Sequence, residues 1–207
     1  MRIGTIIVSR SKACHVKTLH TILKLNLKCV QKQFANEIIF VNDDPYAKAE
    51  AIFKALKNYD RIFFIDFGIH VDEGSLDQLF EKHEGVNALV FPAPVEGVDW
   101  DMFKNKVKEG VDEPIEQMGL HFDTELGGKF AGDVYHVRKT NPKCFVLNCK
   151  AVKKKLEGTK LTSTATMFQK LIESNIKIHA YTKARLIATY THECISNILN
   201  AAGVKAT

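Results

Sequence analysis

Short apolar runs alternate with longer segments of helical spacing through the first half of the chain. Four continuous apolar runs predict strands buried on both faces, at 3–8, 37–41, 61–65 and 87–91. Three segments between them predict helices from their apolar spacing or their composition, at 16–30, 46–58 and 74–83. Strands and helices that alternate through short connections predict an α/β fold with a parallel sheet.

The second half of the chain has a less regular pattern. Prolines and the stretch 119–132 predict long loops after the fourth strand. Beyond them we expect strands at 133–137, 144–147, 176–179 and 186–189, helices at 151–156 and 165–174, and a last helix beginning near His192. Because no repeat, low-complexity tract or linker divides the chain, we expect one domain over residues 1–207.

Composition and charge restrict the class of protein. The 207 residues are 45% hydrophobic and 26% charged, which is typical of a soluble globular chain and excludes a disordered, collagen-like or disulfide-scaffold protein. The net charge is only +5, and the lysines are scattered. The densest run, Lys153 to Lys155, follows an apolar stretch and predicts a solvated helix face, so no nucleic-acid partner is expected.

The cysteines and the N-terminal segment indicate the compartment. Five cysteines form an odd set without a CxxC pair, which predicts free thiols of a reducing compartment rather than disulfides or a zinc site. The apolar start of the chain is too short for a signal peptide, and no segment approaches the ~20 apolar residues of a membrane span. We therefore expect a cytoplasmic protein without a membrane span.

Polar residues follow three of the predicted strands. Ser9 and Arg10 come after the first strand, Asp43 and Asp44 after the second, and Asp66 after the third. Because ligands bind outside the carboxyl ends of the strands in such sheets, these side chains are predicted to share a binding edge. Carboxylates there can accept hydrogen bonds from a ribose or a base, or hold a divalent cation against a diphosphate. The alternative for an acid such as Asp43 is a helix cap.

Three segments at these strand ends carry a resemblance to a known family. They are Ile6-Ile7-Val8-Ser9-Arg10, the run Ile-Ile-Phe-Val-Asn-Asp-Asp at 38–44, and the stretch 59–72, which contains Asp66-Phe67-Gly68. With them the chain resembles the GT-A glycosyltransferases, which use nucleotide sugars. The resemblance implies a three-layer Rossmann-like α/β fold, with a mostly parallel central sheet and helices on both faces. It also implies a nucleotide-binding half at 1–92 and an acceptor-side half at 93–207.

The same resemblance assigns roles to the residues at the strand ends. The nucleotide is expected to contact Ser9, Arg10, Asp43, Asp44 and Asp66. Asp66 also begins the family's D-x-D motif and is expected to hold Mn²⁺ or Mg²⁺, with His192 as the late histidine of the metal site. The sequence departs from the motif at the second acid, where it has Gly68. Either Asp66 binds the cation with help from His70 or Asp72, or the metal site is degenerate.

The resemblance implies transfer of a sugar from a nucleoside diphosphate sugar, with a UDP-sugar favoured, to a hydroxyl of a glycan or glycoprotein acceptor. Inverting members place an acidic base at the start of a late helix, but the stretch 160–166 has no carboxylate. Asp133 and Glu125 are the candidates for this base, with Asp123 and His121 as alternatives. A retaining mechanism needs no such base. Compact domains of this kind also resemble glycan-building enzymes of large DNA viruses, which would place the protein in the host cytoplasm.

Two other functions stay open. One is a catalytically degenerate GT-A-fold protein that serves in binding or assembly, which Gly68 and the missing late carboxylate favour. The other is a sugar nucleotidyltransferase, which normally has a Gly-rich basic loop after its first strand. The segment Ser9-Arg10-Ser11-Lys12 is basic but has no glycine. A phosphoacceptor receiver-like domain leaves too much of the chain unexplained.

Overall fold

The computed structural model describes residues 1–156 and 161–189, together with Ile195 and Ile198. The strands are β1 (Arg2–Ser9), β2 (Ala35–Asn42), β3 (Arg61–Ile65), β4 (Ile69–Val71), β5 (Ala88–Val90), β6 (Thr124–Ala131), β7 (Val134–Thr140), β8 (Cys144–Asn148), β9 (Ile178–Tyr181) and β10 (Leu186–Ala188). The helices are α1 (Val16–Gln31), α2 (Pro45–Asn58), α3 (Glu73–Leu76), α4 (Trp100–Glu109), α5 (Cys149–Lys155) and α6 (Thr164–Glu173), with 3-10 turns at Asp77–Leu79 and Ile115–Gln117.

One eight-stranded sheet forms the centre of the described structure, in the order β2-β1-β3-β8-β5-β9-β7-β6. Strand β1 is parallel to both β2 and β3. Strand β8 runs antiparallel to β3 and to β5, and β5 is parallel to β9, so β5 and β9 point the same way as β1 to β3. The β6–β7 hairpin completes the sheet through an antiparallel pairing of β7 with β9. This arrangement confirms the predicted α/β fold, with reversed strands at β8 and β7.

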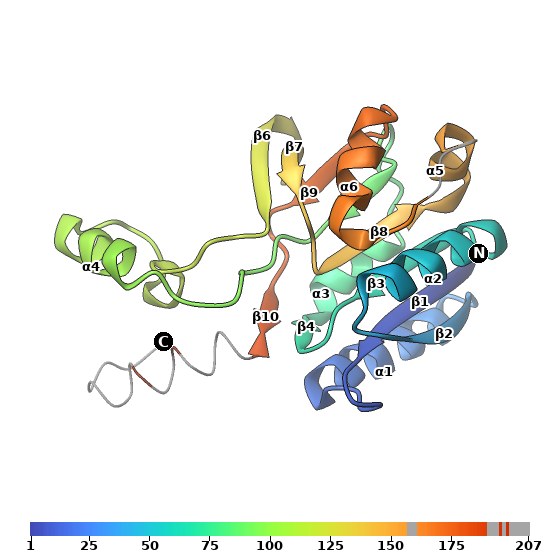
Figure 1. Cartoon of the computed structure of the whole chain (residues 1–207), viewed down its shortest axis with the longest axis horizontal. Coiled ribbons are helices and arrows are strands. Elements are labelled where there is room, and N and C mark those ends of the chain that lie inside the picture. The colour runs from blue at the N-terminus through green and yellow to red at the C-terminus, as the bar shows by residue number, and fades with distance from the viewer. Residues whose placement is uncertain (157–160, 190–194, 196–197, 199–207) are drawn as a thin grey trace.

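The central strands β1, β3, β5 and β8 are buried on both faces because helices cover both, whereas the edge strand β2, predicted as buried, is largely exposed. Successive residues of β3 show this: Phe63 belongs to the apolar cluster under α1, whereas Phe64 belongs to the cluster under α2, α5 and α6. Both rings are almost fully buried, and burying one such side chain contributes about 2 kcal/mol. Helices on both faces confirm the predicted three layers, and the ribbon shows α1 and α2 on opposite sides of β1 (Figure 1).

Some of the predicted elements are wrong in detail. The region predicted as loops contains α4 and β6, and α4 extends away from the sheet (Figure 1). Glycines and prolines around these segments obscured their periodicity. In place of the helix predicted at 74–83, the structure has the short α3, which packs against α1, and a 3-10 turn that follows it. The helix predicted near His192 lies outside the described residues.

Two further observations concern the cysteines and the helices. Cys14, Cys29, Cys144 and Cys149 are free thiols in the described structure, and three of them are buried. Among the described helices, none has both the length and the apolar character that crossing a membrane requires.

Candidate functional site

The parallel pairing of the first strands brings their carboxyl ends to one edge of the sheet. In the register of β1 and β2, Ser9 stands opposite Asn42, and in the register of β1 and β3, Ile7 stands opposite Ile65. The residues that follow each strand therefore start within a few ångströms of one another. Arg10, Asp43 and Asp66 meet at this carboxyl edge, as the sequence predicted.

A tight turn directly after β1 directs Arg10 toward the other strand ends. The backbones of Arg10 and Ala13 exchange two hydrogen bonds, of 3.1 and 2.8 Å, and the two residues between them, Ser11 and Lys12, have φ angles of 50° and 62°. Positive φ at both central positions is the conformation of a two-residue hairpin turn. The guanidinium carbon of Arg10 lies 5.1 Å from the centre of the Phe67 ring, which follows β3.

Four charged side chains form a connected cluster at this edge, which we call the carboxyl-edge cluster: Arg10, Asp43, Lys48 and Asp66. The Arg10 Nε donates to Asp43 Oδ2 at 2.7 Å. The Lys48 Nζ lies 2.6 Å from Asp43 Oδ1 and 3.5 Å from Asp66 Oδ2. Lys48 thus connects the acids that follow β2 and β3, and both oxygens of Asp43 face a cation.

Burial and pairing together set the electrostatics of the cluster. The Lys48 side chain is only 11% exposed, and that of Asp43 is 28% exposed. Burial would raise the pKa of Asp43, but the hydrogen bonds from Lys48 and Arg10 outweigh it and hold this pKa below its usual value. Burial would likewise lower the pKa of Arg10, but the bond to Asp43 raises it above its usual value. Arg10 and Asp43 are therefore an ion pair near neutral pH.

Lys48 is the functional residue that the sequence analysis missed. It lies in the first turns of α2, on the same buried face as Ala49, Ile52 and Ala55. Lysine is rarely buried unless its ammonium is paired. A lysine at an apolar position of the predicted helix 46–58, just after an acidic strand end, is a signal that could have identified it.

A small cavity of about 140 Å³ opens beside the cluster. Its polar lining comes from Lys48, Asp66, Asn141, Lys143 and Thr164, and apolar rings close it from below. Asn141 and Lys143 lie in the connection between β7 and β8, and Thr164 begins α6. The cavity has room for one phosphate-sized group, and a complete nucleotide sugar would extend from it over the open edge.

Asp123 fixes the connection that carries Lys143. Its carboxylate accepts hydrogen bonds from the backbone N–H of Ala93 at 3.1 Å, the backbone N–H of Lys143 at 3.0 Å and the Thr124 hydroxyl at 2.8 Å. Burial raises the pKa of Asp123 despite these donors. The contacts give this acid a structural role in place of the alternative role of a base.

Two of the predicted nucleotide-binding residues use their side chains on the protein's own backbone. The Ser9 hydroxyl donates to the Val41 carbonyl at 3.1 Å. The Asp44 carboxylate caps α2 by accepting from the N–H groups of Tyr46 and Ala47. Of the two neighbouring acids, Asp44 is the cap and Asp43 is the one that faces the cluster.

The predicted catalytic acids Asp133 and Glu125 lie on the β6–β7 hairpin. Asp133 pairs with Lys183 at 3.0 Å, and Glu125 with Arg138 at 3.7 Å. In the strand order, β8, β5 and β9 separate this hairpin from β3, which ends at Ile65, directly before Asp66. The described contacts do not bring either acid to the carboxyl-edge cluster, and their catalytic role stays a prediction.

The described residues do not match the divalent-cation site that the D-x-D resemblance implies. Of the oxygens of Asp66, one accepts the N–H of Phe67 at 2.7 Å and the other faces Lys48. Asp72 caps α3, and His70 Nδ1 contacts the Thr21 hydroxyl at 2.9 Å. Among residues 1–156 and 161–189, no three potential ligands gather in one place. His192, the other predicted ligand, lies outside the described residues.

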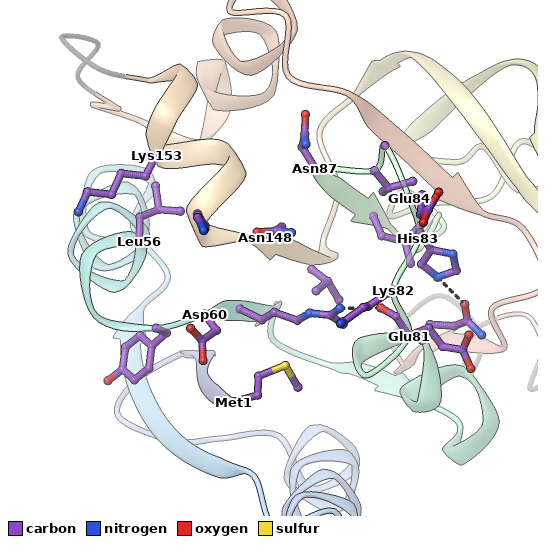
Figure 2. Close-up of a pocket in the computed structure, with 18 of the residues that line it drawn as sticks. Met1, Leu56, Asp60, Glu81, Lys82, His83, Glu84, Asn87, Asn148 and Lys153 are labelled. Atoms are coloured by element: carbon purple, nitrogen blue, oxygen red, sulfur yellow. Dashed lines mark hydrogen bonds between the residues drawn. The ribbon is translucent and has the colours of Figure 1, made fainter.

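A larger hollow of about 700 Å³ lies at the opposite, amino edge of the sheet (Figure 2). Asp60 and Arg61 at the start of β3, Asn87 before β5 and Asn148 at the end of β8 are among its lining residues. The close-up shows Asp60, Asn148 and Lys153 among the residues around this open space (Figure 2). We call this region the amino-edge hollow. None of the catalytic, nucleotide-binding or metal-binding residues predicted from the sequence lines it.

Comparisons with known proteins bear on the fold. No protein-family model matches the chain, and no curated protein does. Among solved structures, a variant of a Drosophila β1,4-galactosyltransferase 7 in complex with manganese, UDP-Gal and xylobiose is similar over 88% of this chain, with 11% identity and a TM-score of 0.47. The chain spans 65% of that galactosyltransferase chain.

Two other similar structures represent different activities. A UDP-glucose pyrophosphorylase complexed with UDP-glucose matches over 96% of this chain and 81% of its own, with 11% identity and a TM-score of 0.48. A glycosyltransferase involved in glycosylation of the major capsid of PBCV-1 matches over 87% and 81%, with 8% identity and a TM-score of 0.44. The neighbours thus include glycosyltransferases and a UDP-glucose pyrophosphorylase, and with TM-scores below 0.5 these likenesses carry no argument about this chain.

Proposed function

We propose that this chain is a glycosyltransferase that moves a sugar from a nucleoside diphosphate sugar, with a UDP-sugar favoured, to a hydroxyl of a glycan or glycoprotein. The observation that carries this proposal is the carboxyl-edge cluster and the cavity beside it. A buried lysine at the carboxyl ends of parallel strands lies where α/β sheets bind nucleotides. Of the cluster, Lys48 and Asp66 line the small polar cavity, and Arg10 lies exposed at the same edge.

The positions of the positive side chains indicate how the site would assist sugar transfer. When the bond between the sugar and the diphosphate breaks, negative charge grows on the departing phosphate oxygens. Preorganised donors aimed at that charge stabilise the transition state more than the ground state. Lys48 and Lys143 line the cavity, and Arg10 is joined to Lys48 through Asp43, so these three side chains would hold the diphosphate. Asp43 would position Arg10 and Lys48 for this task.

The acceptor hydroxyl needs a group to take its proton in an inverting reaction. We keep Asp133 and Glu125 as the candidates for this general base, on the acceptor-side half of the chain. The matched variants Asp133→Asn and Glu125→Gln keep the shape of each side chain and remove its basicity. If one of these acids is the base, its variant should transfer the sugar more slowly than the parent and bind the nucleotide with the same affinity.

A sugar nucleotidyltransferase is the second candidate, and the turn after β1 argues against it. Such an enzyme needs an open loop at this point to wrap a triphosphate with backbone N–H groups. Here the backbone N–H groups of Arg10 and Ala13 are bonded to each other's carbonyls in a two-residue turn. These two N–H groups are therefore not available to a phosphate, which favours a donor that is bound by side chains.

Calorimetric titration with UDP, GDP and CDP tests the proposal directly. We expect one of the three to bind, and Arg10→Ala to weaken this binding about tenfold, as the loss of one charge-assisted hydrogen bond does. Lys54→Met is the matched control, because Lys54 is exposed on α2 and pairs only with Glu50 among the ion pairs of the described residues. Binding of none of the three nucleotides would refute the proposal. Formation of pyrophosphate from a nucleoside triphosphate and a sugar phosphate would replace it by the nucleotidyltransferase.

A further inference from the structure

We propose that Lys48 supplies the positive charge that the D-x-D resemblance assigns to a divalent cation, so that the nucleotide diphosphate binds without a metal ion. This inference rests on the proposed function, because it concerns how the same site holds its donor. It departs from the sequence-based expectation of Mn²⁺ or Mg²⁺.

The position of the ammonium group is the first argument. Its Nζ lies 2.6 Å from Asp43 and 3.5 Å from Asp66, between the acids that follow two strands, each of which pairs in parallel with β1. Asp66 is the carboxylate that the resemblance assigns to a cation bridging to a diphosphate. A second cation at Asp66 would stand next to the ammonium and be repelled by it.

The backbone at position 68 is the second argument. The second acid of a D-x-D motif would fall on Gly68, whose φ is +75°. This region is favourable for glycine and costs energy for a residue with a side chain. The local conformation therefore suits a glycine. The second acid of the motif is absent from this position, and no adjacent residue takes its place. His70 and Asp72 do not compensate, because each is engaged elsewhere in the described structure.

The third argument is that Lys48 keeps the capacity to bind an anion. A lysine ammonium has three donors, and the two carboxylates account for two of them. Lys48 also lines the 140 Å³ cavity together with Lys143. The remaining donor of Lys48 can therefore reach a ligand in this cavity. Asp43, Asp66 and the exposed Glu96 balance the charges of Arg10, Lys48 and Lys143. Among the charged residues that line the cavity itself, two are lysines and one is an acid, so a phosphate group would meet more positive than negative side chains there.

The test compares nucleotide binding with and without metal in the parent protein. UDP, GDP and CDP are titrated in EDTA and again in excess Mn²⁺, and we expect the nucleotide that binds to do so with the same affinity in both. Lys48→Met preserves the length of the side chain and removes its charge. We expect it to weaken binding about tenfold or more in both conditions. Lys54→Met, on the exposed face of the same helix, should bind as the parent does.

The outcomes separate this inference from the proposed function. Binding that requires Mn²⁺ in the parent overturns the inference and leaves the transferase proposal standing. Unchanged binding by a folded Lys48→Met also overturns it. Binding of no nucleotide in either condition overturns the proposed function, and the inference with it. If circular dichroism shows that Lys48→Met is unfolded, the comparison of EDTA with Mn²⁺ in the parent decides alone, since it needs no variant.

Discussion

The carboxyl-edge cluster and the amino-edge hollow are two places among the described residues that could hold a ligand, and they differ in how their charges are held. The hollow is five times larger, at about 700 Å³ against 140 Å³. Its lysines, among them Lys82, Lys150 and Lys153, are exposed to solvent. At the carboxyl edge, Lys48 is buried and contacts two acids that come from different strands.

This comparison shows that the volume of a cavity alone does not identify a functional site. A solvated lysine keeps its hydration and interacts weakly with its neighbours. A buried ammonium is unfavourable unless a well-placed set of partners surrounds it, and such a set constrains several elements at once. The smaller region therefore carries the stronger indication of function, and three measurements test this ranking.

The largest expected effect is on stability, at the carboxyl edge. Asp123→Ala removes the acceptor of two backbone N–H groups and one hydroxyl, and we expect it to lower the free energy of unfolding by about 3 kcal/mol. Asp60→Ala at the amino edge removes an exposed acceptor of the Arg2 N–H and should cost less than about 1 kcal/mol. Urea unfolding of both variants measures the contrast, and equal losses would contradict it.

A smaller effect is expected from acid. Because the pKa of Asp43 is lowered by folding, its pairing contributes stability above the unfolded pKa of about 3.9, and this contribution is lost as the pH falls through the lower folded pKa. The parent should therefore lose stability below about pH 4 more steeply than Asp43→Asn, which cannot be protonated there. Unfolding free energies measured at several points on either side of this pH give the two slopes. Parallel slopes would show that Asp43 is not held by Arg10 and Lys48.

The smallest effect is expected at the amino-edge hollow. Lys153→Met removes a charge from its lining, and we expect the nucleotide affinity of this variant to equal that of the parent. Calorimetry with the nucleotide that binds measures this. A loss as large as that of Arg10→Ala would reverse the ranking of the two regions and transfer the proposed donor site to the amino edge.

The fold was largely predictable because its central strands are buried on both faces. A continuous apolar run such as 61–65 is typical of a strand covered by helices on either side, and it is too short for a buried helix. The elements that were missed, α4 and β6, are largely exposed, and the prolines and glycines around them predict loops. Their positions depend on contacts with distant parts of the chain, which periodicity does not contain.

The candidate site was predictable only in part. The strand ends identified Arg10, Asp43 and Asp66, because the topology of a parallel sheet brings such positions together. A proline rule could have separated the two neighbouring acids: Pro45 favours the first position of a helix, which makes Asp44 the cap and leaves Asp43 for the site. Lys48 was missed because a lysine in a helix is normally taken as solvated, and only the packing of α2 shows that its side chain is buried.

The attachment of Lys48 to α2 has a consequence for regulation. A bound metal ion has a dissociation equilibrium, so the occupied fraction of a metal site follows the concentration of free ion around it. An ammonium group on a helix packed into the core has no such equilibrium, and its local concentration is constant. A donor site built on Lys48 would keep its affinity when free Mn²⁺ or Mg²⁺ changes, and would respond instead to the concentration of its nucleotide sugar.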